Sequence, residues 1–220
     1  MHAVTYHELL GYLGIPRRRD PDVQLPIDHL CRIGSNTRVA EKRLRSLGSV
    51  FKSVRDFPRV KTLLNFDIHG EPSYRVCALC LADDEVPYLR IQWRFKDWKY
   101  CPVHRNALME RCPECGVSII STKVSLGHSP NGDLLDISHC YLCGHSRAHS
   151  GAACPCATID DRELAVQNFL VSAVLHGHFF IEGFAKRFDL DFLLWLRGNY
   201  QWDGPRVAPT NSATADARAI

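Results

Sequence analysis

Four pairs of metal-ligating side chains, each with two residues between its members, constrain the fold of this chain more than any other feature. They are Cys77 and Cys80, Cys101 and His104, Cys112 and Cys115, and Cys140 and Cys143. A two-residue gap lets both side chains of a pair approach one metal ion from a tight turn. Gly116 and Gly144 directly follow two of the pairs, where such a turn often needs a positive φ. Ten cysteines in a chain whose first residues do not resemble a secretory signal favour thiolate–metal binding over disulfides.

Joining the pairs in sequence order predicts two zinc ions per chain. The first ion is held by Cys77, Cys80, Cys101 and His104, and the second by Cys112, Cys115, Cys140 and Cys143. The halves of the sites lie 20 and 24 residues apart, which is typical of zinc ribbons. Four protein ligands leave no open position for a reactive water, so we expect both ions to be structural.

The ligand set of the second site has competitors nearby. His139, His145, Cys154 and Cys156 all lie close enough in sequence to replace one of its members. Cys140 and Cys143 are favoured because their gap, followed by Gly144, repeats the pattern of the preceding pair. Cys154 and Cys156 are separated by a single proline, which makes convergence on one ion awkward.

Other functional classes find little support in the sequence. A RING domain would place its histidine two or three residues before the next cysteine, whereas seven residues separate His104 from Cys112. The phosphate-binding loop, the hydrolase nucleophile elbow and the zinc-protease motif are all missing from the sequence. No run of about 18 apolar residues is present, so no membrane span is expected. We therefore expect no enzymatic activity.

Residues 27–48 show the pattern of two short helices. Ile27, Leu30 and Ile33 recur at a spacing of three, residues 34–36 interrupt the pattern, and Gly48 is expected to end the second helix. Eight basic and only two acidic side chains lie between positions 38 and 61. This combination suits a helix-turn-helix over residues 27–70, and an ordinary solvated pair of helices is the alternative.

One face of the second helix carries a basic stripe. Arg38, Lys42 and Arg45 repeat at helical spacing, and we predict that they contact nucleic acid. The formal net charge of +3 falls to zero once two Zn²⁺ ions are bound through seven thiolates. Any nucleic-acid surface must therefore be local.

The remaining segments complete an α+β fold, in which a small tandem zinc-ribbon module is flanked by helical segments. A helix is predicted over 160–176, capped by Asp160, and one or two further helices over 180–197. Residues 88–95 are expected to form a strand on which Trp93 covers the zinc site and Arg90 and Arg94 are solvated or face a partner. The predicted domains are a connector at 1–26, the basic region at 27–70, the zinc module at 71–150, a helical region at 151–203 and a disordered tail at 204–220.

The order of residues from Tyr88 to Gly116 is informative beyond its metal ligands. An aromatic–Arg–Trp segment is followed by Cys-Pro-Val-His, a leucine and Glu-Arg-Cys-Pro-Glu-Cys-Gly. This order resembles the TniQ/TnsD family of bacterial transposition proteins, specifically over residues 74–116 and more broadly to 145. The usual Glu-Ser-Leu…Ser-Trp-Leu opening of that family is not evident here.

The resemblance implies a non-enzymatic adaptor in transposition target selection. Such a protein would link an AAA+ ATPase regulator to either a guide-RNA effector complex or attachment-site DNA, in the bacterial cytoplasm. The residues that carry over are the zinc ligands named above. A stand-alone DNA-binding regulator that uses residues 27–61 is the alternative function, and a zinc-dependent enzyme is a distant third. The apolar segment 160–197 is also compatible with a homodimer.

Overall fold

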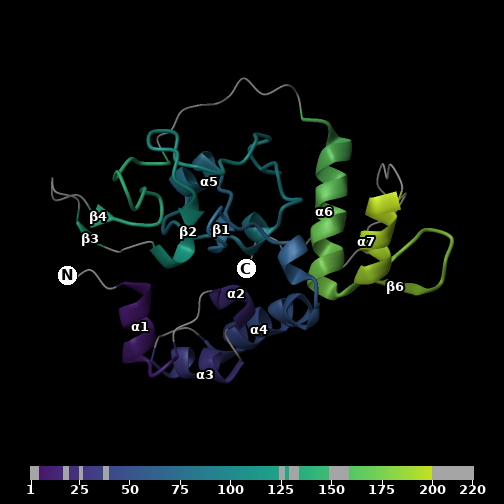
Figure 1. Cartoon of the computed structure of the whole chain (residues 1–220), viewed down its shortest axis with the longest axis horizontal. Coiled ribbons are helices and arrows are strands. Elements are labelled where there is room, and N and C mark those ends of the chain that lie inside the picture. The colour runs from purple at the N-terminus through teal and green to yellow at the C-terminus, as the bar shows by residue number, and fades with distance from the viewer. Residues whose placement is uncertain are drawn as a thin grey trace.

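Helices lie below and to one side of a cysteine-rich middle segment that contains little regular structure (Figure 1). The computed structural model describes residues 5–16, 20–24, 27–36, 40–123, 127–128, 134–148 and 159–199. The helices are α1 (Tyr6–Tyr12), α2 (Pro21–Gln24), α3 (Ile27–Asn36), α4 (Glu41–Asp56), α5 (Ala78–Asp83), α6 (Asp161–His176) and α7 (Leu190–Asn199), with 3-10 turns η1 (Val60–Thr62), η2 (Ile91–Arg94) and η3 (Ser121–Lys123). The strands are β1 (Ser73–Tyr74), β2 (Ile119–Ile120), β3 (Gly127–His128), β4 (Leu134–Leu135), β5 (His178–Phe180) and β6 (Arg187–Asp189). The α+β fold class is confirmed.

The described strands form three antiparallel two-stranded sheets, pairing β1 with β2, β3 with β4, and β5 with β6. In the first sheet Ser73 lies opposite Ile120, and Tyr74 lies opposite Ile119. This sheet therefore joins the segment just before the first zinc pair to the segment just after the third pair. A sheet of two residues per strand cannot stabilise itself, so the surrounding contacts must hold it.

The main hydrophobic core draws on α4, the middle segment, α6 and the C-terminal β5–β6 hairpin and α7. Val54 of α4, Trp93 and Phe95 of the middle segment, Val174 of α6 and Leu193 of α7 are all buried in it. Three ligands of the first predicted zinc site belong to the same cluster. A smaller cluster of Leu10, Leu13 and Ile15 ties α1 to α3 through Ile33.

The helices near the N-terminus differ from the expectation in their boundaries. α3 continues through residues 34–36, because Ser35 and Asn36 donate side-chain hydrogen bonds to the Cys31 and Arg32 carbonyls of its last turns. α4 begins at Glu41 and passes Gly48 to reach Asp56. A glycine inside a helix costs only about 1 kcal/mol. Packing of α4 against α6 offsets that cost. The intervening turn at 37–39 lies outside the described residues, so the helix-turn-helix stays a prediction.

The C-terminal region is partly as predicted. The helix over 160–176 is confirmed as α6, with Asp160 accepting a hydrogen bond from the Arg162 N–H and Gly177 ending it at φ 74°. Within the segment predicted to hold one or two helices, 180–197, one helix is confirmed as α7, and the residues before it form the β5–β6 hairpin instead. Phe179 and Phe188 lie opposite each other in this hairpin, an aromatic pairing that favours strands. The predicted tail at 204–220 lies outside the described residues.

The prediction of a strand over residues 88–95 is wrong, because residues 91–94 form the 3-10 turn η2. The turn directs Arg94 inward, where its side chain is 0% exposed. Its Nη2 lies 2.6 Å from the Asp20 carboxylate, and its Nε lies 3.1 Å from that of Asp22. Arg94 is therefore neither solvated nor available to a partner.

Further contacts make this a closed buried network. The Tyr74 hydroxyl donates to Asp22 at 2.5 Å, and Arg94 Nη1 donates to the Asn65 carbonyl. The guanidinium also lies 4.6 Å above the centre of the Phe66 ring. Burial raises the pKa of Tyr74 well above its usual value, and the Asp22 carboxylate adds to that shift. The network attaches the segment around α2 to the zinc-bearing middle of the chain.

The side chain of Arg90 is less deeply buried than that of Arg94. Both of its terminal nitrogens contact the Asp84 carboxylate, at 2.9 and 2.7 Å. Its guanidinium stacks over the rings of Tyr88 and Trp93. Trp93 itself is buried in the cluster that also contains three ligands of the first site, and its covering of the zinc ion stays a prediction.

We expect Arg94→Ala to destabilise the protein strongly, because it leaves two carboxylates buried without their cation. The expected loss in the free energy of unfolding is about 3–5 kcal/mol, measured by urea denaturation. Arg90→Ala is the matched control, since its ion pair is partly solvated, and should cost about 1 kcal/mol. Equal losses for the two variants would contradict a special role for the buried network.

Candidate metal centres

The four residues of the first predicted tetrad meet at one point. Cys77 is the N-cap of α5 and Cys80 lies in its first turn, so one helix start presents both sulfurs. Cys101 and His104 lie in a tight hairpin closed by the bridge between Tyr100 and Ala107. All four ligand atoms lie within 4.8 Å of one another.

The distances in this tetrad fit a tetrahedral zinc ion. Zinc–ligand bonds of about 2.3 Å to sulfur and about 2.0 Å to nitrogen imply S–S separations of about 3.8 Å and S–N separations of about 3.5 Å. His104 Nδ1 lies 3.4, 3.3 and 3.6 Å from the sulfurs of Cys77, Cys80 and Cys101. The Cys80 and Cys101 sulfurs are 3.6 Å apart. Four convergent ligands at these separations make a closed structural site.

The ring of His104 is oriented from its far side. While Nδ1 faces the thiols, Nε2 lies 2.9 Å from the Asp83 carboxylate. Metal-bound histidines usually have such a carboxylate partner, which fixes the ring and increases the basicity of the ligating nitrogen. Asp83 was not identified from the sequence, because nothing in its spacing from the ligands distinguishes it from other exposed acidic residues.

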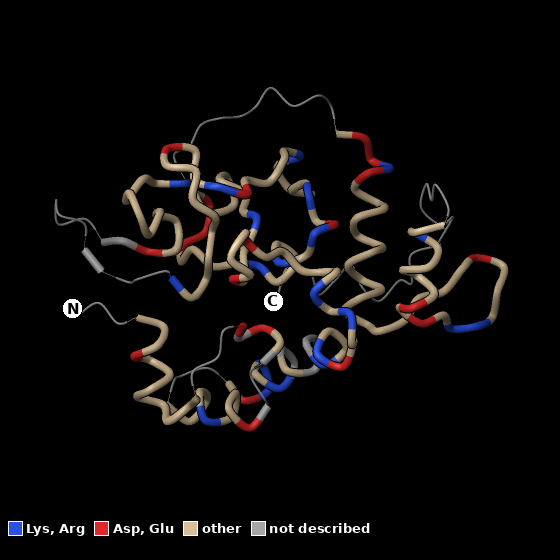
Figure 2. Tube along the Cα trace, viewed as in Figure 1, with Lys and Arg blue, Asp and Glu red and all other residues tan. Residues whose placement is uncertain are grey.

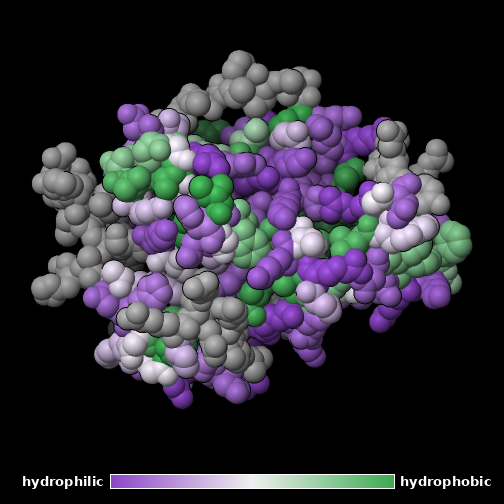
Figure 3. Space-filling view, in the orientation of Figure 1, coloured by the Kyte–Doolittle hydropathy of each residue, from purple (hydrophilic) through white to green (hydrophobic). Residues whose placement is uncertain are grey.

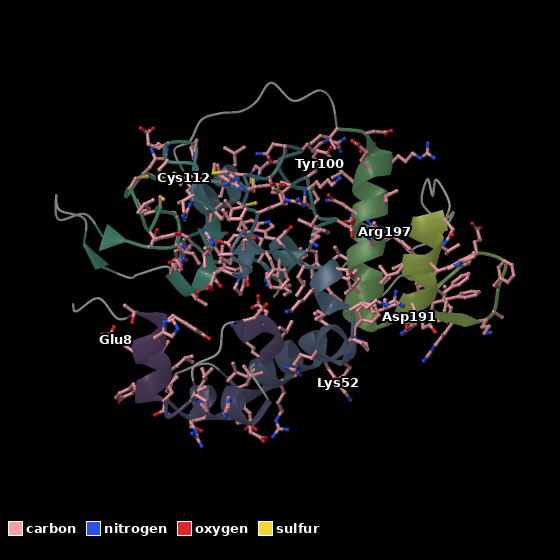
Figure 4. The ribbon with its side chains drawn as sticks, viewed as in Figure 1. Glu8, Lys52, Tyr100, Cys112, Asp191 and Arg197 are labelled. Atoms are coloured by element: carbon pink, nitrogen blue, oxygen red, sulfur yellow. The ribbon has the colours of Figure 1, made fainter. Side chains whose placement is uncertain are left out.

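Backbone groups and α6 hold the hairpin of the first site. The His104 N–H points at the Cys101 sulfur at 3.4 Å. Hydrogen bonds from the neighbouring Cys77 and Cys80 thiols lower the pKa of Cys101 to about 3. Gln167 of α6, which is buried, accepts from the Tyr100 N–H and donates to the Tyr100 carbonyl; Figure 4 labels Tyr100 beside α6. The helix therefore fixes the base of the hairpin.

The second predicted tetrad also converges. Its four sulfurs lie within 4.8 Å of one another, with Cys112 3.7 Å from Cys143 and Cys115 3.6 Å from Cys140. Each half is a hairpin, closed by a bridge between Arg111 and Ser118 in one case and between His139 and Ser146 in the other. These distances match the edge of a zinc tetrahedron.

The two glycines adopt the conformation that their position predicts. Gly116 and Gly144 have φ values of 70° and 72°. The N–H of each donates to the carbonyl of the first cysteine in its pair, at 2.9 Å in both cases. The second site is thus built from two copies of one turn.

Of the four competing ligands, the two that the structure describes do not join the second tetrad. His139 Nδ1 lies 3.0 Å from the Asp136 carboxylate and is engaged there. His145 is not a member of either cluster that could hold a metal among the described residues. Cys154 and Cys156 lie outside the described residues. The two tetrads predicted from the sequence therefore fit two structural zinc ions.

The second site is more open than the first and is flanked by a buried cation. Cys112 and Cys140 are buried, whereas Cys115 and Cys143 are exposed. Arg147 is 0% exposed, and its Nη1 donates to the Ile137 carbonyl at 3.0 Å. Its Nε and Nη2 have no hydrogen-bond partner in the described part of the chain.

The cysteine sulfurs near Arg147 compensate the burial of its positive charge. Burial lowers the pKa of Arg147, while the nearby Cys140, Cys112 and Cys143 groups oppose that shift. Four thiolates around one Zn²⁺ carry a net charge of −2, which a buried guanidinium partly neutralises. Sequence reasoning missed Arg147, since only the fold brings it against the cluster.

The predicted nucleic-acid contacts are only partly visible. Lys42 and Arg45 are exposed on α4, where Figure 2 shows basic residues gathered. Arg45 forms an ion pair with Glu41 at 2.6 Å, one helical turn before it. Arg38 lies outside the described residues. The contacts to nucleic acid stay a prediction.

A protein-family model matches the N-terminal part of the chain. The family model described as TniQ matches residues 1–108. This range contains every ligand of the first tetrad and ends before the second. No curated protein matches the chain. Among the described residues, no helix has both the length and the apolar composition needed to cross a lipid bilayer.

We expect Cys140→Ser to reduce the bound zinc from two ions per chain to one, because it removes a ligand from the second tetrad. Structural zinc contributes about 10 kcal/mol to folding in small modules, so this ribbon should also unfold. Elemental analysis of the purified protein gives the stoichiometry. The double variant Cys154→Ser with Cys156→Ser is the control and should keep both ions. A single ion in that control would show the second ligand set to be wrong.

We expect Arg147→Met to weaken zinc binding at the second site by about 10- to 100-fold, the usual effect of removing an outer-sphere partner. Competition with a chromophoric chelator measures the affinity, and the first site serves as an internal reference. Arg147→Lys keeps the positive charge and should recover part of the loss. Unchanged affinity in Arg147→Met would show that the thiolates do not depend on this cation.

Proposed function

We propose that this chain, whose residues 1–108 match the family model described as TniQ, is a non-enzymatic adaptor in the selection of transposition targets. The adaptor bridges a target-recognition element, either a guide-RNA effector complex or attachment-site DNA, to an AAA+ transposition regulator. The observation that carries the proposal is that the residues matched by the family model include all four ligands of the first tetrad.

The chemistry of the two tetrads supports a scaffolding role. Each tetrad offers four protein ligands, which fills a tetrahedral zinc ion and leaves no position for a water nucleophile. Zinc bound in this way stabilises the fold without taking part in a reaction. We therefore propose that both ions shape surfaces for partners.

The shared core suits a bridging protein. Val54 of α4 and Val174 of α6 are buried in the same cluster as Trp93 and ligands of the first zinc site. A partner held at α4 and a partner held at the zinc module would thus be kept in a fixed relation. That relation is what an adaptor must supply.

The exposed basic side of α4 is the proposed contact for nucleic acid. Lys42, Arg45 and Lys52 are exposed there, and Lys52 is labelled at the outer side of α4 in Figure 4. The pair of Arg45 with Glu41 is solvated, so it is worth at most about 1 kcal/mol and can exchange for a phosphate contact. The same face supports the alternative function, a stand-alone DNA-binding regulator.

The test measures both contacts of the adaptor in one set of samples. The purified chain is mixed with an AAA+ transposition regulator, with and without target DNA or guide-RNA complex, and co-purification is measured. Wild type should bind both. Replacing Arg38, Lys42 and Arg45 with Ala should lower the salt dependence of nucleic-acid binding by a slope of about 2–3 and leave regulator binding intact.

The outcomes separate the two functions. Tight nucleic-acid binding without any association with the AAA+ regulator would favour the alternative function, a stand-alone DNA-binding protein, over the adaptor. Binding to neither partner would contradict both. An unchanged salt slope in the triple variant would show that α4 is an ordinary solvated helix.

A further inference from the structure

The two tetrads differ in how far their sulfurs are exposed. In the first tetrad Cys77, Cys80 and Cys101 are all buried, and the fourth ligand is an imidazole, which cannot form a disulfide. In the second tetrad all four ligands are thiols, and one member of each hairpin, Cys115 or Cys143, is exposed. The susceptibility of a thiolate to oxidation follows its exposure. An oxidant in solution therefore reaches the second tetrad before the first.

The hairpin that carries Cys143 lies at the surface of the molecule. Leu142, the neighbour of Cys143 in the chain, is 66% exposed. Figure 3 shows hydrophobic surface on the side of the molecule where Figure 4 labels Cys112. Hydroperoxides, which are small and uncharged, can reach sulfurs at such a surface directly.

Each exposed sulfur has a buried sulfur of the other hairpin beside it. Cys143 lies 3.7 Å from Cys112, and Cys115 lies 3.6 Å from Cys140. Cys112 and Cys140 are 2% and 1% exposed, so neither is open to direct attack. The exposed member of each couple is thus placed to react with an oxidant, and the buried member is placed to resolve the product into a disulfide.

We propose that the second tetrad is an oxidation site for hydroperoxides, at which disulfides between the two hairpins replace the zinc ion. The Cys143 thiolate attacks the terminal peroxide oxygen, the O–O bond breaks, and a sulfenic acid forms while alkoxide or hydroxide leaves. The Cys112 thiolate then attacks this sulfur, forms the S–S bond and expels hydroxide. The two sulfurs lose two electrons, which reduce the peroxide, and water protonates the leaving anions. Cys115 and Cys140 repeat the reaction with a second hydroperoxide.

Either disulfide is sufficient to release the ion. It removes two of the four thiolates, and the two that remain cannot complete a tetrahedral zinc site. Each disulfide also joins one hairpin to the other, so the two halves of the module stay linked after the ion has left. A dithiol reverses the reaction by exchange, in which the dithiol becomes the disulfide, and zinc can then bind again.

Arg147 converts the loss of thiolates into a change of shape. Its guanidinium is buried near Cys140 and Cys112, and its Nε and Nη2 have no hydrogen-bond partner in the part of the chain that the structure describes. A disulfide carries no charge, so oxidation leaves this cation buried beside neutral sulfurs. Because an uncompensated buried charge is costly, the segment around Arg147 opens in the oxidised protein. This inference rests on the two zinc sites and not on the proposed adaptor function.

The first experiment follows zinc release from the intact, zinc-loaded chain during exposure to hydrogen peroxide, with a chromophoric chelator as the readout. The chain carries Cys154→Ser and Cys156→Ser, so that these thiols take no part. One of the two ions should leave about tenfold faster than the other. Peptide mapping without reduction should then find the disulfides between the two hairpins, with the cysteines of the first tetrad still reduced. Dithiothreitol and zinc should restore two bound ions.

The second experiment measures the change of shape by brief digestion with trypsin. The reduced, zinc-loaded protein should resist cleavage after Arg147, because this residue is 0% exposed. The oxidised protein should be cut there. Arg94 is the matched control, since it is equally buried but is paired with carboxylates, which the peroxide does not alter. It should resist cleavage in both states.

A double variant tests the exposed sulfurs themselves. Cys115→His with Cys143→His leaves a Cys₂His₂ set, which zinc accepts, and removes both thiols that the peroxide can reach. It should bind two ions and release the second at least about tenfold more slowly than wild type. Cys31→Ser removes a thiol outside both tetrads and should behave like wild type. If the double variant binds a single ion, the disulfide map and the cleavage at Arg147 decide the matter.

Each of four results would overturn the proposal. One is the release of both ions at the same rate. Another is a map with disulfides only within one hairpin, or with sulfinic and sulfonic acids instead of disulfides. A third is a double histidine variant that binds two ions and loses the second as fast as wild type. The last is an oxidised chain that trypsin does not cut after Arg147, which would contradict the change of shape.

Discussion

Convergence of thiolate and imidazole ligands is the constraint on which the middle of this protein depends. Between α4 and α6 the described strands contain two residues each, and the helix α5 has six. Elements of this size have no independent stability in water. What organises them is a set of hairpins whose tips carry ligands, together with the hydrophobic core that they share with α4, α6 and α7.

The positive charges of two buried arginines are balanced by different kinds of group. Arg94 is paired with the carboxylates of Asp20 and Asp22, at 2.6 and 3.1 Å. Arg147 instead lies near Cys140, Cys112 and Cys143, whose charge opposes the fall in its pKa that burial causes. These cysteines are also ligands of the second tetrad. We therefore expect zinc removal to perturb the fold around Arg147 more than the fold around Arg94.

The sequence was a good guide where short-range chemistry decides the structure. The spacing of Cys112, Cys115 and Gly116 predicts both a ligand pair and a positive φ, because the geometry of a tight turn is local. Asp160 likewise predicts the start of α6. The metal tetrads could therefore be assembled from spacing alone.

The failures lie where distant residues decide the structure. Residues 91–94 show the alternation of a strand, but Arg94 is drawn inward by carboxylates more than seventy positions earlier in the chain. Gly48 looks like a helix end, but packing against α6 carries α4 past it. The pairing of Phe179 with Phe188 turns an apparently helical aromatic pattern into a hairpin. The periodicity of a sequence does not identify contacts between residues that are far apart in the chain.

The pairing of β1 with β2 has a consequence for the order in which the protein can assemble. Ser73 and Tyr74 pair with Ile120 and Ile119. This sheet can therefore form only after the chain has been synthesised well past His104. The first tetrad is complete in sequence by then, whereas Cys140 and Cys143 have not yet followed. During synthesis the first zinc ion can thus hold the nascent chain in shape while the sheet forms around it, and the second ion is added to a scaffold that already exists.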